Sequence, residues 1–92
     1  MYLEIVSPEA TLFSGEVTSV AVPGVNGEFE MLNNHAPVIS TLKSGEVKIS
    51  GNNIKLDEDI ASKFSNKDGK TLLSITSGTV EMKDNKVIIL AD

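Results

Sequence analysis

Apolar and polar residues alternate with a period of two along most of this chain, in short runs that end at turn-forming residues. Side chains of a β-strand point alternately to opposite faces, whereas an amphipathic helix needs a period near 3.6. Residues 46–50 show the pattern well, with Val47 and Ile49 predicted to face inward. Because many short strands separated by regular turns are typical of a sandwich or barrel, the sequence predicts an all-β fold.

The predicted strands share alternating or β-branched apolar residues, which pack well on a pleated surface. They are residues 2–6, 16–22, 28–32, 38–42, 46–50, 72–75, 79–83 and 86–90. The last of these runs is apolar on both faces, which predicts a central strand covered on both sides. Asn26-Gly27, Asn33-Asn34 and Asp84-Asn85 are turn signals, because Asn, Asp and Gly tolerate positive φ.

Residues 51–70 do not fit this pattern, and two alternatives remain open for them. In the first, Asp57 caps one short helix, with Ile60 and Phe64 four residues apart on one face. In the second, residues 54–56 form a further strand. The segment otherwise begins and ends in turn-forming residues.

Length and composition exclude several classes of protein. A chain of 92 residues predicts one domain over residues 1–92, and the lack of cysteine excludes disulfides and cysteine-bound metals. A net charge of −5 without clusters of Lys or Arg argues against binding to nucleic acid or to anionic lipid. The longest clean apolar run, residues 87–91, is far below the roughly 20 residues that span a bilayer. Any membrane association is therefore expected to go through a partner.

No residue pattern points to catalysis. His35 is the only histidine, and no nucleophile motif accompanies it, so a turn or interface histidine is favoured over a general base. Asp57-Glu58-Asp59 lacks the ligand spacing of a calcium loop, which favours a solvated acidic stretch. Gly24 and Gly27 lack the GK[ST] ending of a phosphate loop and are expected in turns. No catalytic, cofactor or metal site is predicted.

Five motifs occur in a fixed order and together cover most of the chain. They read LFSGEV at residues 12–17, GEFEMLNNHAPVI at 27–39, LKSGEVKI at 42–49, SGTVEM at 77–82 and VIILAD at 87–92. In this order they resemble the epsilon subunits of bacterial F-type ATP synthases. Each motif alone is weak, but the ordered set is specific.

This resemblance implies a flattened β-sandwich of about ten short, mostly antiparallel strands. It implies a non-catalytic rotor subunit that binds the gamma subunit and the ring of membrane c subunits. Through them it would help couple ion flow to ATP synthesis in the alpha-beta hexamer. It also implies a peripheral location on the cytoplasmic face of the bacterial inner membrane, no cofactor, and a monomer when isolated.

The resemblance also assigns residues to two interfaces. Gly27 and Glu28 match positions beside the c-ring, although a solvated hairpin acid is an equally weighted alternative for Glu28. The positions that match the gamma interface are Ser7, His35, Ala36, Pro37 and Val38.

Many relatives continue past the last strand into a two-helix domain that can inhibit ATP hydrolysis. This chain is then either a naturally short form or an excised domain, and we favour the short form, without an inhibitory arm and without an ATP site. One rival interpretation is a free-standing β-sandwich that binds peptide or glycan, but aromatic residues make up only 4% of the chain and Trp is absent. A small hydrolase using His35 is the other rival.

Overall fold

The computed structural model describes residues 1–92 and consists of ten strands and one turn of 3₁₀ helix. The strands are β1 Tyr2–Val6, β2 Thr11–Glu16, β3 Ser19–Gly24, β4 Gly27–Leu32, β5 Val38–Leu42, β6 Gly45–Ser50, β7 Phe64–Lys67, β8 Lys70–Ile75, β9 Gly78–Lys83 and β10 Lys86–Ala91. The 3₁₀ turn, η1, is Ala61–Lys63. The predicted all-β fold is confirmed, and no helix is long and apolar enough to cross a membrane.

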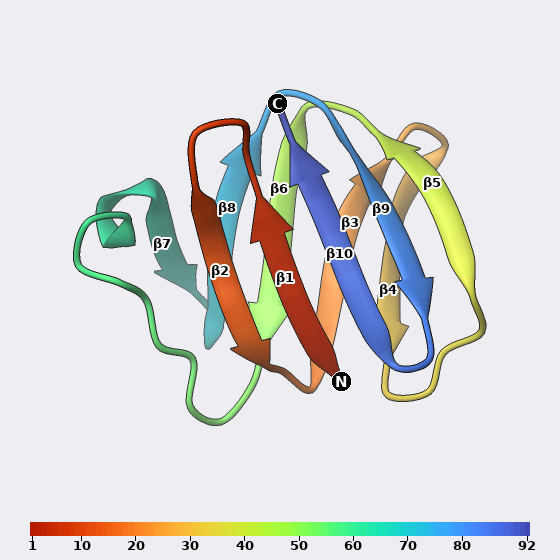
Figure 1. The fold of residues 1–92 in the computed structure, drawn as a ribbon, viewed down its shortest axis with the longest axis horizontal. Helices are drawn as coiled ribbons and strands as arrows, with labels where there is room; N and C mark the ends of the chain where they lie inside the picture. The colour runs from red at the N-terminus through yellow and green to blue at the C-terminus, as the bar shows by residue number, and fades with distance from the viewer.

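The strands form one continuous sheet that curls into two layers (Figure 1). β2, β1, β10, β9 and β5 lie side by side in the first layer, and β4, β3, β6, β8 and β7 in the second. The layers join where β5 meets β3, through the single pair Gly24 and Leu42. Neighbouring strands are antiparallel except β1 and β10, which pair in parallel.

Alternation along the strands places one face of each layer in a shared core. Val47 and Ile49 of β6 are fully buried, as predicted. Met31 and Met82 are also buried in this core. β3 differs from the other strands because all six of its residues are buried.

Most predicted turns form with the backbone geometry that their residues favour. Asp84 and Asn85 join β9 to β10 with φ values of 52° and 61°, and Asn34 has φ 62° in the turn after β4. The β3–β4 hairpin differs from the prediction in one respect. Asn26 is not at positive φ there, and Gly27 alone takes it, with φ 123°.

The run 16–22, predicted as one strand, is divided between the two layers. β2 ends at Glu16, and β3 begins at Ser19. Between them Thr18 donates from its backbone N–H and its Oγ1 to the carbonyl of Ser50, at 2.8 and 3.0 Å, while the side chain of Val17 enters the core. The chain crosses between layers at this bend. The run of β-branched residues in the sequence does not predict it.

Residues 51–70 differ from both alternatives. Residues 54–57 form no strand, and the helix is only η1. The Asp57 side chain makes no cap, and instead its backbone carbonyl accepts from the N–H groups of Ile60 and Ala61 at 3.1 and 2.9 Å. β7 was not among the predicted strands; it pairs with β8 through an Asp68-Gly69 turn with φ 53° and 77°.

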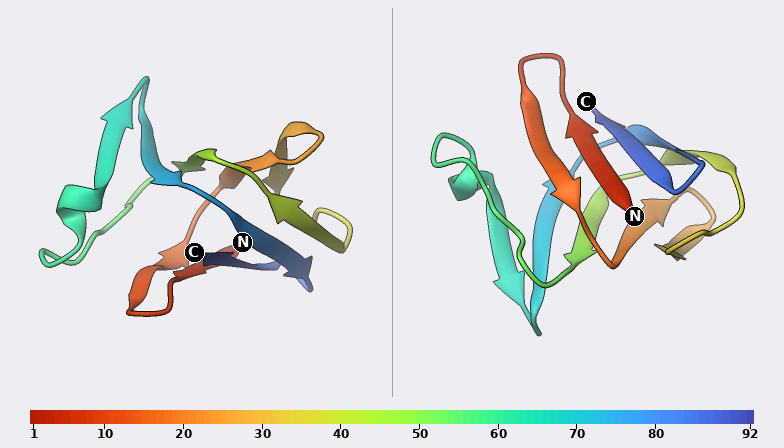
Figure 2. Two further views of the ribbon diagram at one scale, coloured as in Figure 1. Left: turned by 90° about the horizontal axis from the view of Figure 1, so that it is seen from above. Right: turned by 60° about the horizontal axis from the view of Figure 1, so that its bottom comes forward.

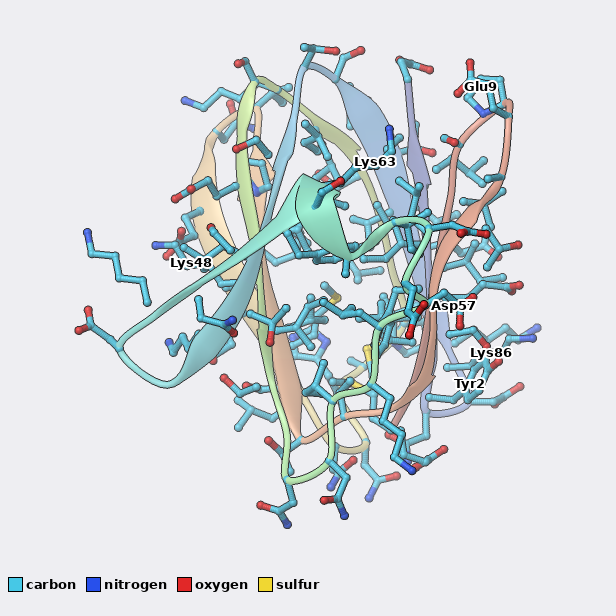
Figure 3. All side chains as sticks on the ribbon, turned by 90° about the vertical axis from the view of Figure 1, so that its left-hand side faces the viewer. Tyr2, Glu9, Lys48, Asp57, Lys63 and Lys86 are labelled. Atoms are coloured by element: carbon cyan, nitrogen blue, oxygen red, sulfur yellow. The ribbon has the colours of Figure 1, made fainter.

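This segment closes the open side of the sandwich between β2 and β7. Figure 2 shows β7 and η1 standing at one side of the two layers. Figure 3 looks onto that side, with Asp57 and Lys63 on the covering segment. Four apolar residues are partly buried against the core here: Ile54, Leu56, Ile60 and Phe64. Covering core residues at the open side removes apolar surface from water, which favours this arrangement.

β10 is central in its layer, as predicted, but it is not covered on both faces. Val87 and Ile89 are buried in the core, whereas Leu90 is 53% exposed on the opposite face. No other part of the chain covers that face. Burial on both faces therefore does not explain why β10 is apolar on both.

We expect Ile54→Ala to destabilise the fold by about 1–2 kcal/mol, less than the roughly 2–5 kcal/mol for a fully buried Ile, because Ile54 is only partly buried. Urea unfolding would measure the change. Ile39→Ala removes the same atoms from a side chain that is 77% exposed, and it should change the free energy of unfolding by less than about 0.5 kcal/mol. Equal effects of the two substitutions would contradict the covering role of the segment.

Candidate functional site

The loop between β4 and β5 is a tight turn followed by an extended, exposed stretch. The N–H of His35 donates to the carbonyl of Leu32 at 3.1 Å, and Asn34 takes positive φ at the third position of this turn. That combination is typical of a type II turn, which favours Gly or Asn at this position. The backbone N–H of Asn34 donates to Oδ1 of Asn85 at 2.7 Å, which ties the loop to the β9–β10 turn.

The predicted gamma-interface residues after this turn are exposed. His35, Ala36 and Pro37 lie on the surface, and Val38 is half-buried where β5 begins. Nδ1 of His35 lies 2.7 Å from the carbonyl oxygen of Ala36, and this neighbour accepts the ring N–H. No acid or nucleophile side chain pairs with the imidazole, so the structure does not assemble a catalytic triad around it.

Beside this loop, the outer face of the first layer carries exposed apolar side chains. Ile39 is 77% exposed and lies opposite Glu81 of β9, which in turn lies opposite the half-buried Ile88 of β10. Leu90, 53% exposed, is the next outward residue along β10. A shallow hollow at the loop end of the face is lined by Pro37, Val38, Ile39, Glu81, Met82 and Lys83.

Ser7, also predicted at the gamma interface, lies at the other end of this layer. It follows Val6, which pairs with Leu90 near the end of β10. The turn that contacts the β4–β5 loop instead comes just before Lys86, at the start of β10. The N–H of Ser7 donates to the carbonyl of Ala10 at 2.8 Å and closes the β1–β2 turn. The structure therefore does not bring Ser7 and His35 together, because the β1–β2 turn and the β4–β5 loop lie at opposite ends of the layer (Figure 1).

The predicted c-ring residues lie at the β3–β4 hairpin, at the same end of the molecule as the β1–β2 turn (Figure 1). Gly27 is exposed, and no atom lies within 4 Å of the position that a Cβ would take there. Glu28 forms an ion pair with Lys48 of β6, with Oε1 and Nζ 3.0 Å apart. The hydrogen bond and charge of Glu28 raise the pKa of Lys48 above its ordinary value of 10.5.

The motifs assign no interface role to Ile39, Leu90 or Asn85. A signal for Leu90 was present, because its strand is apolar on both faces. That pattern predicted a strand buried on both faces, not a strand with one apolar face exposed. No sequence signal identifies the contact of Asn85 with the loop, since it depends on how two turns meet. The structure also contains no group of three or more His, Cys, Asp or Glu residues that could hold a metal ion.

Residues 1–61 match the family model described as the ATP synthase delta/epsilon chain, beta-sandwich domain. The ATP synthase epsilon chain of Chlorobaculum tepidum is 38% identical over 90 residues, covering 98% of this chain and 86% of that relative. The chain belongs to the ATP synthase epsilon family. The epsilon chain of Campylobacter curvus is 40% identical over 92 residues, but the match covers only 60% of that longer relative.

Solved structures support the same fold. A chain in the central stalk and c-ring structure of the Tetrahymena thermophila mitochondrial ATP synthase superimposes with a TM-score of 0.71, over 99% of this chain and 62% of that one, at 18% identity. A chain of the Euglena gracilis mitochondrial enzyme gives a TM-score of 0.72, over 97% of this chain and 48% of that one, also at 18% identity. The predicted β-sandwich is confirmed.

Family membership makes the chain a subunit of ATP synthase with a structural or regulatory role rather than a catalytic one. The resemblance inferred from the five motifs is thereby confirmed. Neither the free-standing binding module nor the small hydrolase agrees with this family. The interface residues assigned from the motifs stay predictions.

The Glu28–Lys48 pair predicts a measurable pH effect in this member of the epsilon family. Because the folded pKa of Lys48 is raised, its contribution to stability is present below about pH 10.5 and is lost as the pH rises through the folded pKa. We expect NMR titration of Lys48 to give a pKa above 10.5, and Glu28→Gln to lower it. A Lys48 pKa that is unchanged in Glu28→Gln would contradict the assigned cause.

Proposed function

We propose that residues 1–92 form a single β-sandwich domain of the ATP synthase rotor that binds the gamma subunit on one side and the c-ring at one end. The domain performs no chemistry itself. Its dense core resists deformation, because protein interiors pack like organic crystals. Rotation driven by ion flow through the c-ring is thereby passed to the stalk without slippage between subunits.

The outer face of the first layer is the observation that most supports the gamma contact. This face runs from the His35–Val38 segment at one end to Ser7 at the other, and Ile39, Ile88 and Leu90 lie between. Five residues of β10 separate the two ends, which corresponds to roughly 15–20 Å of strand. Stable interfaces have an apolar centre with a polar rim and bury roughly 800 Å² on each partner, which a sheet face of this kind can supply.

No other element of the chain packs on the exposed apolar side chains of this face. Ile88 and Leu90 are consecutive outward residues of β10, and exposed apolar side chains that adjoin one another are typical of protein contact sites. Ile39 lies further across the same face, beyond Glu81. Glu4 and Glu81 lie in the same row as Ile39 and Ile88, so the partner surface is expected to offer basic side chains opposite them. A gamma subunit lying along the first layer would reach all the residues that the motifs assign to it.

The β3–β4 hairpin is the proposed contact with the c-ring. Glu28 and Lys48 are both partly exposed, with side-chain exposures of 51% and 34%, so an approaching basic or amide group can share the carboxylate. Gly27 leaves the hairpin without a side chain at this point, which lets a partner backbone approach closely. Such a contact fixes register between the subunits more than it adds affinity.

The proposed location is the cytoplasmic face of a bacterial inner membrane, with membrane attachment only through the complex. The support is the bacterial origin of the relatives from Chlorobaculum tepidum and Campylobacter curvus. Both are named as ATP synthase epsilon chains. We also propose that the isolated domain is a monomer that binds no nucleic acid.

The proposed gamma contact predicts that Ile39→Asp weakens binding to the cognate gamma subunit by at least tenfold, because it puts a charge in place of the most exposed large apolar side chain of this face. Titration calorimetry or surface plasmon resonance would measure the affinity. Val25→Asp places the same charge on the β3–β4 hairpin, where Val25 is 49% exposed, and should leave gamma binding unchanged. Tight binding by Ile39→Asp would refute the assigned face, and no binding by the unaltered chain would refute the function.

A further inference from the structure

The turn that precedes the proposed gamma segment has few contacts of its own. All of residues 33–37 are exposed, and the one backbone hydrogen bond within the turn joins His35 to Leu32. In a type II turn this bond uses the N–H of the fourth residue and leaves the N–H of the third, here Asn34, without a partner inside the turn. The turn therefore needs an outside acceptor to be held in one position.

Asn85 supplies that acceptor. Its Oδ1 receives the N–H of Asn34 at 2.7 Å, from a residue 51 positions away in the sequence. Asn85 has φ 61°, next to Asp84 at φ 52°, so two consecutive left-handed residues form the tight turn of the β9–β10 hairpin. Because Lys83 and Lys86 pair directly on either side, the amide is fixed to the layer that carries the exposed apolar face.

A second tether holds the same turn from another direction. The Met1 ammonium group donates to Oδ1 of Asn33 at 2.6 Å, and it also lies 3.4 Å from the carbonyl of Val17. The Met1 residue is itself buried. Asn33 and Asn34 are thus each tied to a different part of the first layer, while His35 to Pro37 have no such tie.

We propose that Asn85 is a positioning residue for partner binding: its side-chain amide holds the Asn34 turn so that His35, Ala36 and Pro37 are ordered against the outer face before the gamma subunit arrives. This inference rests on the proposed function. A loop that is already ordered does not have to lose conformational freedom on binding, so its affinity is higher than that of a free loop with the same contacts.

Three substitutions separate this role from a purely structural one. Asn85→Gly removes the acceptor but keeps a residue that tolerates positive φ, so the hairpin should form with little change in melting temperature. Asn85→Asp keeps an oxygen acceptor at the same place. Asp84→Gly is the matched control, because it makes a similar change at the neighbouring position, whose side chain makes no hydrogen bond to the loop.

In Asn85→Gly we expect the Asn34 amide to exchange with solvent several-fold faster and the affinity for the cognate gamma subunit to fall roughly three- to tenfold, which corresponds to one lost hydrogen bond. Asn85→Asp should restore both values, and Asp84→Gly should change neither. Hydrogen exchange by NMR and binding by calorimetry give the two readouts on the same folded chain.

Unchanged binding by Asn85→Gly would overturn the inference, as would failure of Asn85→Asp to restore it. An equal loss in Asp84→Gly would also overturn it, because the hairpin rather than the amide would then be responsible. If the unaltered chain itself does not bind gamma, the proposed function fails. That result is distinct, because the exchange rate of Asn34 still reports whether the amide holds the turn.

Discussion

The junction between the two layers depends on β3, the one strand that pairs with three others. Its last residue, Gly24, meets Leu42 of β5, and a Cβ at Gly24 would lie only 2.8 Å from the carbonyl oxygen of Gly27. Backbone bonds from Val25 to Thr41 and from Lys43 to Pro23 close the same seam, at 3.2 and 2.9 Å. A side chain at Gly24 would clash with the carbonyl of Gly27 and with the ring of Phe29, both on β4, at the end of β3 that also pairs with Leu42. The last residues of β3 therefore hold both β4 and β5, and the junction between the layers depends on them.

Much of the fold could be predicted from local sequence because local physics decides it. Val47 and Ile49 face inward because strand alternation requires it, and Asp84-Asn85 turns the chain because these residues tolerate positive φ. The failures lie where tertiary contacts decide. The bend at Thr18 depends on Ser50, distant in sequence, and β7 exists only because β8 accepts it as a partner. The Asp68-Gly69 pair was a usable hairpin signal for β7, but the polar residues beside it hid the strand.

The candidate site was predictable in part for the same reason. The motifs located the exposed segment from His35 to Val38, but a sequence gives no measure of how much of a strand remains uncovered. Leu90 and Ile39 could be interpreted as core until the empty face beside them was known. The two proposed contact surfaces differ in chemistry. An apolar sheet face suits a permanent partner, whereas the Glu28–Lys48 pair at the hairpin is polar and open to exchange.

The parallel pairing of β1 with β10 has a consequence for how the protein is made. β1 leaves the ribosome well before β10, and the two strands can pair only after both have emerged. Both layers contain local hairpins that can form while synthesis continues, such as β1 with β2 and β3 with β4. β1 can pair with β2 early, but its other edge stays open until β10 emerges, and open strand edges favour aggregation. The first layer, and with it the face proposed for the gamma subunit, therefore closes only when these two distant strands meet.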